Sequence, residues 1–232
     1  MDASRYIVLP RTFHGDTMLP DIFIAMNTVH SGSTWAEAHA LLDRDGAFML
    51  PPWIFLNFLK LLQTGNVYDA MGSELASTTI RDIYTEITAR GMTREEWLDA
   101  HFTEEDGTLN MASVHRMNNG IPRPQNCQPL DGCLMQDSVP PNGIDLVSLT
   151  KNATLQGLPS KKVSRGETAW TYPRLDTVLR FGADHAKTGF YCGKHPGYSN
   201  DCIAVRPARI SLRETVGEAR VDPTLLAIGG RQ

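Results

Sequence analysis

Four cysteines are the first candidates for metal chemistry, but their spacing matches no zinc-binding pattern. They are Cys127, Cys133, Cys192 and Cys202, and no two of them form a C-x-x-C pair. Tetrahedral zinc sites need clustered ligands. Two interpretations stay open for these cysteines: four free thiols, or one or two disulfides.

The histidines and carboxylates form no recognisable catalytic motif. The seven histidines are scattered: His14, His30, His39, His101, His115, His185 and His195. His39 falls in an amphipathic segment, which favours a structural role. G-x-S-x-G, H-E-x-x-H, the P-loop and G-x-G-x-x-G are all absent from the sequence. Asp43 and Asp45, near Gly46, lack the EF-hand spacing. The sequence therefore predicts no catalytic residues, no metal, no cofactor and no enzymatic activity.

Composition excludes two classes of partner. The 232 residues are 41 % hydrophobic and 21 % charged, as in an ordinary globular protein. A formal charge of −4 offers no basic excess for phosphates, so nucleic-acid binding is not expected. The longest apolar stretch, residues 49–62, contains two prolines, an asparagine and a lysine, so membrane insertion is not expected either.

The first 16 residues lack the charged start and apolar run of a secretory signal. Localisation is therefore unassigned, although assembly into a virion or display at a cell surface is compatible with the sequence.

Helical spacing dominates the N-terminal half. Thr34-x-x-Glu37 is a capping box, and the helix that it begins should end at Gly46. A short strand-like step over residues 47–50 leads to a second helix that starts at Pro51–Pro52 and ends at Gly65. A third helix is predicted over residues 73–90, and a fourth, short one is predicted to begin at residue 93.

Turn residues and short strands characterise the rest of the chain. Residues 102–167 are rich in Gly, Pro and Asn, which predicts a loop-rich insertion with a strand at 144–149, or alternatively a flexible linker. Strands are then predicted at residues 169–172, 177–181, 188–192 and 202–210. A single domain over residues 1–210 with a C-terminal tail at 211–232 is the expected organisation.

Two separated segments resemble the C-type-lectin-like superfamily, in its formylglycine-generating-enzyme branch. The first is TWAEA at residues 34–38 followed by GAFMLPPWIF at 46–55, and the second is IAVRPAR at 203–209. The resemblance implies an α+β, C-type-lectin-like fold with helices in the N-terminal half, the long insertion, and a small antiparallel sheet in the C-terminal third. Trp35, Leu50, Trp53, Trp170 and Arg206 would fix this scaffold.

Residues 170–209 resemble the variable region of diversity-generating-retroelement proteins, which use this fold for binding. Variation in that family arises at adenines, and the resulting codons commonly exclude Lys, Glu, Gln, Met and Trp. Residues 181–202, FGADHAKTGFYCGKHPGYSNDC, break this restriction only at Lys187 and Lys194. Tyr and His beside Ser, Gly and Asn are also typical of paratopes.

The resemblance implies a hypervariable protein that binds a protein or another cell-surface ligand. The predicted ligand-binding residues are Asp176, Phe181, Asp184, His185, Tyr191, Cys192, His195, Tyr198, Asn200 and Asp201. Two alternatives remain: a formylglycine-generating-type enzyme, for which Cys192 and Cys202 would be the reactive pair, and a purely structural virion or surface component.

Two structural expectations follow from the residues themselves. Residues 34–62 and 168–210 should pack together, because neither segment can bury its apolar face alone. Arg206 lies in an apolar strand, where an unpaired charge would be costly. Its guanidinium should therefore be partly buried, with backbone carbonyls as partners.

Overall fold

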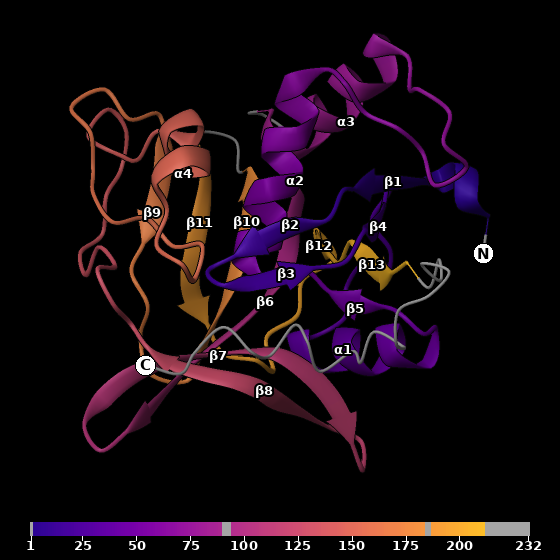
Figure 1. Cartoon of the computed structure of the whole chain (residues 1–232). Coiled ribbons are helices and arrows are strands. Elements are labelled where there is room, and N and C mark those ends of the chain that lie inside the picture. The colour runs from indigo at the N-terminus through magenta and orange to yellow at the C-terminus, as the bar shows by residue number, and fades with distance from the viewer. Residues whose placement is uncertain (1, 90–93, 184–186, 212–232) are drawn as a thin grey trace.

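The computed structural model describes residues 2–89, 94–183 and 187–211 of the chain (Figure 1). Within these ranges, 40 % of the residues adopt β-structure and 22 % are helical. The predicted C-type-lectin-like α+β fold, with helices in the N-terminal half and a small C-terminal antiparallel sheet, is therefore wrong. The described ranges instead contain a large mixed sheet, a smaller antiparallel sheet and four α-helices.

The smaller sheet joins segments that lie far apart in the sequence. Its strand order is β1-β4-β13-β5, and every neighbouring pair is antiparallel. The strands are β1 (Tyr6–Leu9), β4 (Ile22–Ala25), β5 (Phe48–Met49) and β13 (Pro207–Ile210), and a 3-10 helix, Ala3–Arg5, precedes β1. Ala208 of β13 lies opposite Ile24 on one side and Phe48 on the other. The last described strand is therefore an inner strand of this sheet.

The larger sheet has seven strands in the order β8-β7-β6-β10-β11-β9, and β12 pairs with β6 beside this path. The strands are β6 (Arg94–Glu105), β7 (Thr108–Asn118), β8 (Ile121–Pro129), β9 (Thr168–Thr171), β10 (Thr177–Ala183), β11 (Thr188–Lys194) and β12 (Ile203–Ala204). β9 runs parallel to β11, and β12 runs parallel to β6. Three of the C-terminal strands, β9, β10 and β11, were predicted at nearly these positions, but their sheet also includes three long strands from the middle of the chain. The single strand predicted at residues 202–210 is wrong, because this segment forms β12 in the large sheet and β13 in the small one.

Those three strands replace the predicted loops. Two-residue turns connect them: Asp106 and Gly107 have φ of 50° and 74°, and Asn119 and Gly120 have φ of 51° and 77°. Positive φ at both positions is typical of the tight hairpin turns that match the twist of a sheet. The prediction of a loop-rich segment from residue 102 is therefore wrong as far as residue 129, and β6 replaces the short helix expected from residue 93.

The helices α1 (Trp35–Arg44) and α2 (Pro52–Thr64) confirm the two strongest helix predictions, and α3 (Ser77–Thr88) confirms the third. The Thr34 hydroxyl accepts from the Glu37 N–H while the Glu37 carboxylate accepts from the Thr34 N–H, as a capping box requires. Gly65 ends α2 at a φ of 70°. Residues 144–149 were predicted as a strand, but Asp145 caps a helix there, α4 (Leu146–Asn152).

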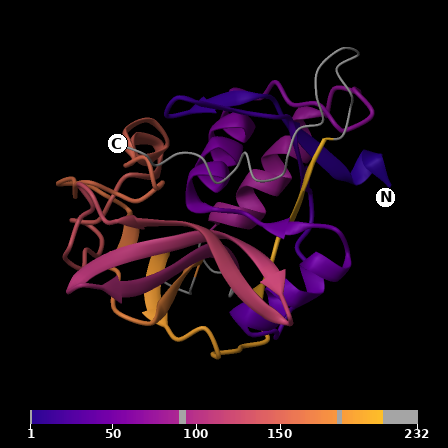
Figure 2. The same ribbon diagram turned by 60° about the horizontal axis from the view of Figure 1, so that its bottom comes forward.

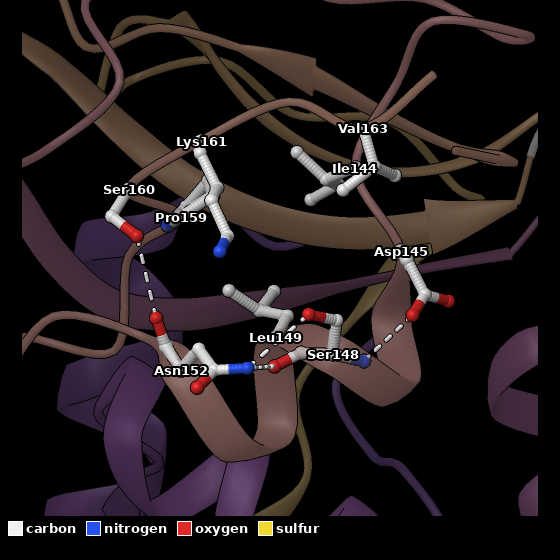
Figure 3. A pocket seen from close by; sticks show the side chains of 9 residues that line it. All are labelled: Ile144, Asp145, Ser148, Leu149, Asn152, Pro159, Ser160, Lys161 and Val163. Atoms are coloured by element: carbon white, nitrogen blue, oxygen red, sulfur yellow. Dashed lines mark hydrogen bonds between the residues drawn. The ribbon is translucent and has the colours of Figure 1, made fainter. Parts of the chain in front are cut away.

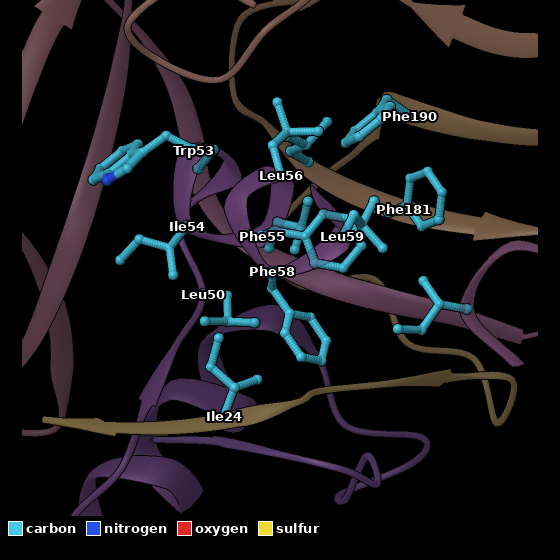
Figure 4. Close-up of a cluster of buried hydrophobic side chains, with 14 of the residues drawn as sticks. Ile24, Leu50, Trp53, Ile54, Phe55, Leu56, Phe58, Leu59, Phe181 and Phe190 are labelled. Carbon is cyan, nitrogen blue, oxygen red and sulfur yellow. The ribbon is translucent and has the colours of Figure 1, made fainter. Parts of the chain in front are cut away.

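One large apolar core lies between the two sheets and around α2 (Figure 4). Phe55 of α2 packs against Phe181 and Phe190, at ring-centroid distances of 5.1 and 6.3 Å, and these two rings lie 4.7 Å apart. A hairpin of β2 (Thr12–His14) and β3 (Thr17–Leu19) covers α2 and stacks His14 on Trp53. The prediction that residues 34–62 and 168–210 pack together is therefore confirmed.

The buried side chain of Arg206 connects the two sheets, because it bonds to Glu96 on β6 and to the backbone at the end of β4. Its side chain is 1 % exposed. Its Nε and terminal nitrogen donate to the two carboxylate oxygens of Glu96, over 3.1 and 2.5 Å. The remaining nitrogen donates to the carbonyls of Ala25 and Met26. The predicted structural role is confirmed, with burial that is complete rather than partial.

No helix among the described residues combines the length and the apolar character that a membrane crossing requires.

Candidate functional site

Asp176, which follows β9 and precedes β10, contacts two histidines with its two carboxylate oxygens. Oδ1 lies 3.0 Å from Nε2 of His101 on β6, and Oδ2 lies 3.0 Å from Nε2 of His195. The Nδ1 of His195 accepts a hydrogen bond from the Gly197 N–H. In the neutral imidazole, Nε2 therefore carries the proton that Asp176 accepts. Asp176 thus fixes the orientation of a histidine whose side chain is 68 % exposed.

The chain after β11 continues this set of contacts. The Lys194 ammonium lies 4.1 Å from the ring centroid of Tyr198, and the Asn200 amide donates to the Tyr198 hydroxyl over 3.4 Å. The Asn200 Oδ1 in turn accepts from the Cys202 N–H, at 2.9 Å. These contacts and the Asp176–His195 pair form one group, here named the 194–200 surface: Asp176, Lys194, His195, Tyr198 and Asn200.

The 194–200 surface lies at one end of the large sheet. Figure 2 shows the yellow segment between β11 and β12 along the outer edge of the molecule, on the same side as α1 and the β7–β8 hairpin. His195 and Asn200 are exposed, whereas Lys194 and Tyr198 are half-buried. Besides the large core, a second and smaller cluster of buried apolar side chains contains Trp35 and Trp97. Tyr198 packs against this second cluster. This surface is therefore outside the core but anchored to it.

The other predicted ligand-binding residues do not extend this surface. Phe181 and Cys192 are 1 % and 0 % exposed and belong to the core. The Tyr191 hydroxyl oxygen is buried, and its ring packs under the Arg180 guanidinium. Asp201 is exposed but lines a different depression beside α1, together with Gly32. Asp184 and His185 lie outside the described residues.

All four cysteines are free thiols. Burial raises the pKa of the Cys192 thiol well above its usual value, and it raises the pKa of Cys133 to about 12. A thiol whose pKa is raised holds little reactive thiolate at neutral pH. The environment of Cys192 therefore does not favour the nucleophilic role that the formylglycine-generating alternative requires.

A second group of polar side chains lies inside the molecule. His39 of α1, Asp99 of β6 and His115 of β7 are 4 %, 2 % and 6 % exposed. The Asp99 Oδ1 is 2.5 Å from Nδ1 of His115 and 3.5 Å from Nε2 of His39. Trp35 packs edge-on against both imidazoles. Sequence spacing gives no signal for this group, because its members come from three separate elements.

The pKa shifts in the buried group reflect its surroundings. Burial lowers the pKa of His39 to about 4, which the nearby Asp99 carboxylate opposes only in part. Burial alone would raise the pKa of Asp99, but the two nearby histidines and the hydrogen bonds from His115 outweigh it and lower that pKa. At neutral pH the group therefore contains an ionised carboxylate and, at His39, a neutral imidazole.

A small pocket lies beside α4 (Figure 3). It is lined by Ile144, Asp145, Ser148, Leu149, Asn152, Pro159, Ser160, Lys161 and Val163. Many of its polar atoms already bond to one another: Asp145 accepts from the Ser148 N–H, and Asn152 donates to Ser148 and accepts from Ser160. Few polar groups are left to orient a ligand, so this pocket is a weak candidate.

Comparison with known proteins identifies no relative. The sequence matches no protein-family model, and neither the curated proteins nor the solved structures give a significant match. The resemblance to variable proteins of diversity-generating retroelements stays a prediction, and the candidate site is argued from its own geometry.

Proposed function

We propose that the protein binds a protein or another cell-surface ligand through the 194–200 surface, and that this surface is hypervariable. The observation that carries the proposal is the fixed arrangement of exposed polar side chains around His195 and Tyr198. Side chains held in place before binding lose less conformational entropy on binding. A tyrosine with a polar tip beside charged groups suits a protein ligand better than a small apolar one.

Burial restricts which positions of the variable segment can change. Phe181, Phe190 and Cys192 are at most 1 % exposed, so random replacement there would damage the core. His195 and Asn200 are exposed and tolerate replacement more readily. Asp176 is also exposed, but its φ of 56° favours residues that accept a left-handed backbone, such as Asn and Gly. Within this short segment, the proposal therefore predicts that codons for buried residues stay constant and that codons for exposed residues vary.

The encoding DNA tests the hypervariable part of this proposal. We expect a nearby, near-identical copy of the coding region for residues 170–209 that differs only at adenines. Sibling sequences should differ at positions 176, 195, 198 and 200 and agree at 181, 190 and 192. If the differences are spread equally over buried and exposed positions, or if no such copy exists, the surface is not diversified in this way.

A triple variant tests binding through this surface. His195→Ala/Tyr198→Ala/Asn200→Ala should lose the binding that the wild-type chain shows on arrays of cell-surface proteins and glycans. Its free energy of unfolding should fall by no more than about 2 kcal/mol, since His195 and Asn200 are exposed and Tyr198 is only half-buried. Array binding and urea unfolding measure the two effects.

A matched control distinguishes lost contact from general damage. Arg81→Ala/Asp82→Ala/Lys151→Ala removes three exposed side chains from α3 and α4, away from the 194–200 surface. The control should retain all wild-type array signals. Signals that survive in the His195/Tyr198/Asn200 variant, or that vanish equally in the control, would place ligand binding elsewhere.

A further inference from the structure

The buried group of His39, Asp99 and His115 brings three metal-binding side chains together. Their ligand atoms all lie within 4.8 Å of one another. Two nitrogens and a carboxylate oxygen form a donor set that zinc and other first-row transition metals use in proteins. The group is separate from the 194–200 surface and has no part in the proposed ligand binding.

The surrounding fold fixes each member of this group. The Trp35 indole donates to the Leu98 carbonyl over 2.9 Å, which holds the start of α1 against β6. The Asp99 N–H donates to the Leu50 carbonyl, and Asp99 Oδ2 accepts from the His115 N–H. Val114 has a φ of 56°, and the pairing of β7 with β8 keeps its register on either side of it, with Ser113 opposite Asn126 and His115 opposite Pro124.

Within the part of the chain that the structure describes, His39 lacks a hydrogen-bond partner for one of its ring nitrogens. The Nε2 of His39 is fully buried and has no hydrogen-bond partner among the described residues. It faces Asp99 Oδ1 at 3.5 Å without the alignment of a hydrogen bond. A buried polar atom without a partner destabilises the folded state, and in native proteins such an atom often marks a missing water or ion.

We propose that His39 Nε2, Asp99 Oδ1 and His115 Nδ1 bind one divalent transition-metal ion, with zinc as the best match. Tetrahedral ligand atoms about 2.0–2.1 Å from zinc lie about 3.3 Å apart. The His39–Asp99 separation of 3.5 Å already fits this geometry. The His115–Asp99 separation of 2.5 Å must widen by less than about 1 Å. The two histidine nitrogens, which lie within 4.8 Å of each other, must approach by at most about 1.5 Å, and side-chain rotations can provide both changes.

The chemistry of the three side chains also suits a metal site. An imidazole nitrogen and a carboxylate oxygen are both ligands that zinc uses, and the negative charge of a carboxylate favours a cation. The proton shared by His115 Nδ1 and Asp99 Oδ1 would be released as the metal binds. Because all three ligands are buried, the ion would enter as the chain folds and would hold α1 against β6 and β7.

The test uses the full-length chain refolded from guanidinium in chelator, in Zn²⁺ or in Co²⁺. We expect one zinc ion per chain after desalting and an intense visible spectrum of tetrahedral cobalt. The melting temperature should exceed that of the chelator-refolded chain by roughly 5–10 °C at a hundredfold excess of zinc over its dissociation constant. Absence of stoichiometric metal in the refolded wild-type chain would overturn the proposal.

Two variants locate the ion. His39→Gln should weaken zinc binding at least about 100-fold, because it removes one of three ligands. His101→Gln/His195→Ala removes both histidines that contact Asp176, which form a second His–Asp–His arrangement among the described residues, and should retain zinc as the wild type does. Loss of zinc in that double variant, or its retention in His39→Gln, would place the ion elsewhere and refute the site. If His39→Gln does not fold, zinc retention by the double variant still decides between the two arrangements.

Discussion

Replacing Arg206 by methionine should lower the free energy of unfolding by about 3–5 kcal/mol, because the change leaves the Glu96 carboxylate buried without its partner. The carbonyls of Ala25 and Met26 lose a donor in the same step. Urea unfolding, followed by tryptophan fluorescence, measures the loss. No other single change to an arginine ion pair of the described residues should cost as much, since the remaining pairs with arginine are more exposed.

A second variant separates the ion pair from simple packing. Arg206→Met/Glu96→Leu removes both charges, and an apolar replacement of a buried pair is often nearly neutral. The double variant should therefore be more stable than Arg206→Met alone. If Arg206→Met stays within about 1 kcal/mol of the wild type, the pair contributes little and Arg206 does not anchor the two sheets.

Phe181→Ala should destabilise the protein by about 3–5 kcal/mol, although Phe181 lies at the start of the segment with paratope-like composition. Its ring packs between Phe55 and Phe190, so truncation leaves a cavity that rigid neighbours cannot close. Urea unfolding gives the size of the effect, and Phe181→Leu, which fills most of the space, should cost clearly less.

Replacement of Phe181 and replacement of a residue in the 194–200 surface should have different effects. Residues 181 and 195 lie only 14 positions apart, yet the first should act on stability and the second on ligand binding. A Phe181→Ala chain that unfolds like the wild type would mean that this ring is not a core element, and the division between scaffold and display positions would be wrong.

Local signals in the sequence were sufficient for α1, α2 and α3 and for the strands β9, β10 and β11. The capping box at Thr34 and the glycine stop at Gly65 each act through neighbouring backbone groups, so their effect is visible in a few residues. The strands near Trp170, Phe181 and Phe190 are bounded by turn residues, which mark their ends as clearly. The positions of these elements were therefore predicted well, but the sheets into which they assemble were not.

β6 shows why the rest was missed. Its residues 96–100 are all buried, so the alternation that identifies a half-exposed strand is absent. A short helix was expected from residue 93, but the segment is a strand in which Glu96 pairs with Arg206 and Asp99 binds His115. Partners 110 and 16 residues away make these charges acceptable in the interior. Short windows of sequence hold no information about such partners.

The two candidate sites differ in the same way: one is built from residues close together in the sequence, and the other from residues far apart. Asp176, His195, Tyr198 and Asn200 were found because residues of one short segment gather on one surface. His39 was identified only as a structural residue, and Asp99 and His115 were not singled out, because their meeting depends on how α1, β6 and β7 pack. A site built from neighbours in the sequence can be predicted from composition, whereas one built across the fold requires the fold.

The inner place of β13 in the small sheet has a consequence for how the protein is made. Until residues 207–210 leave the ribosome, the edges of β4 and β5 that will flank this strand have no partner. Unpaired strand edges in a nascent chain invite pairing with other chains. The small sheet can close only after residues 207–210 have been synthesised, so a chaperone that shields the edges of β4 and β5 until then should increase the yield of folded protein.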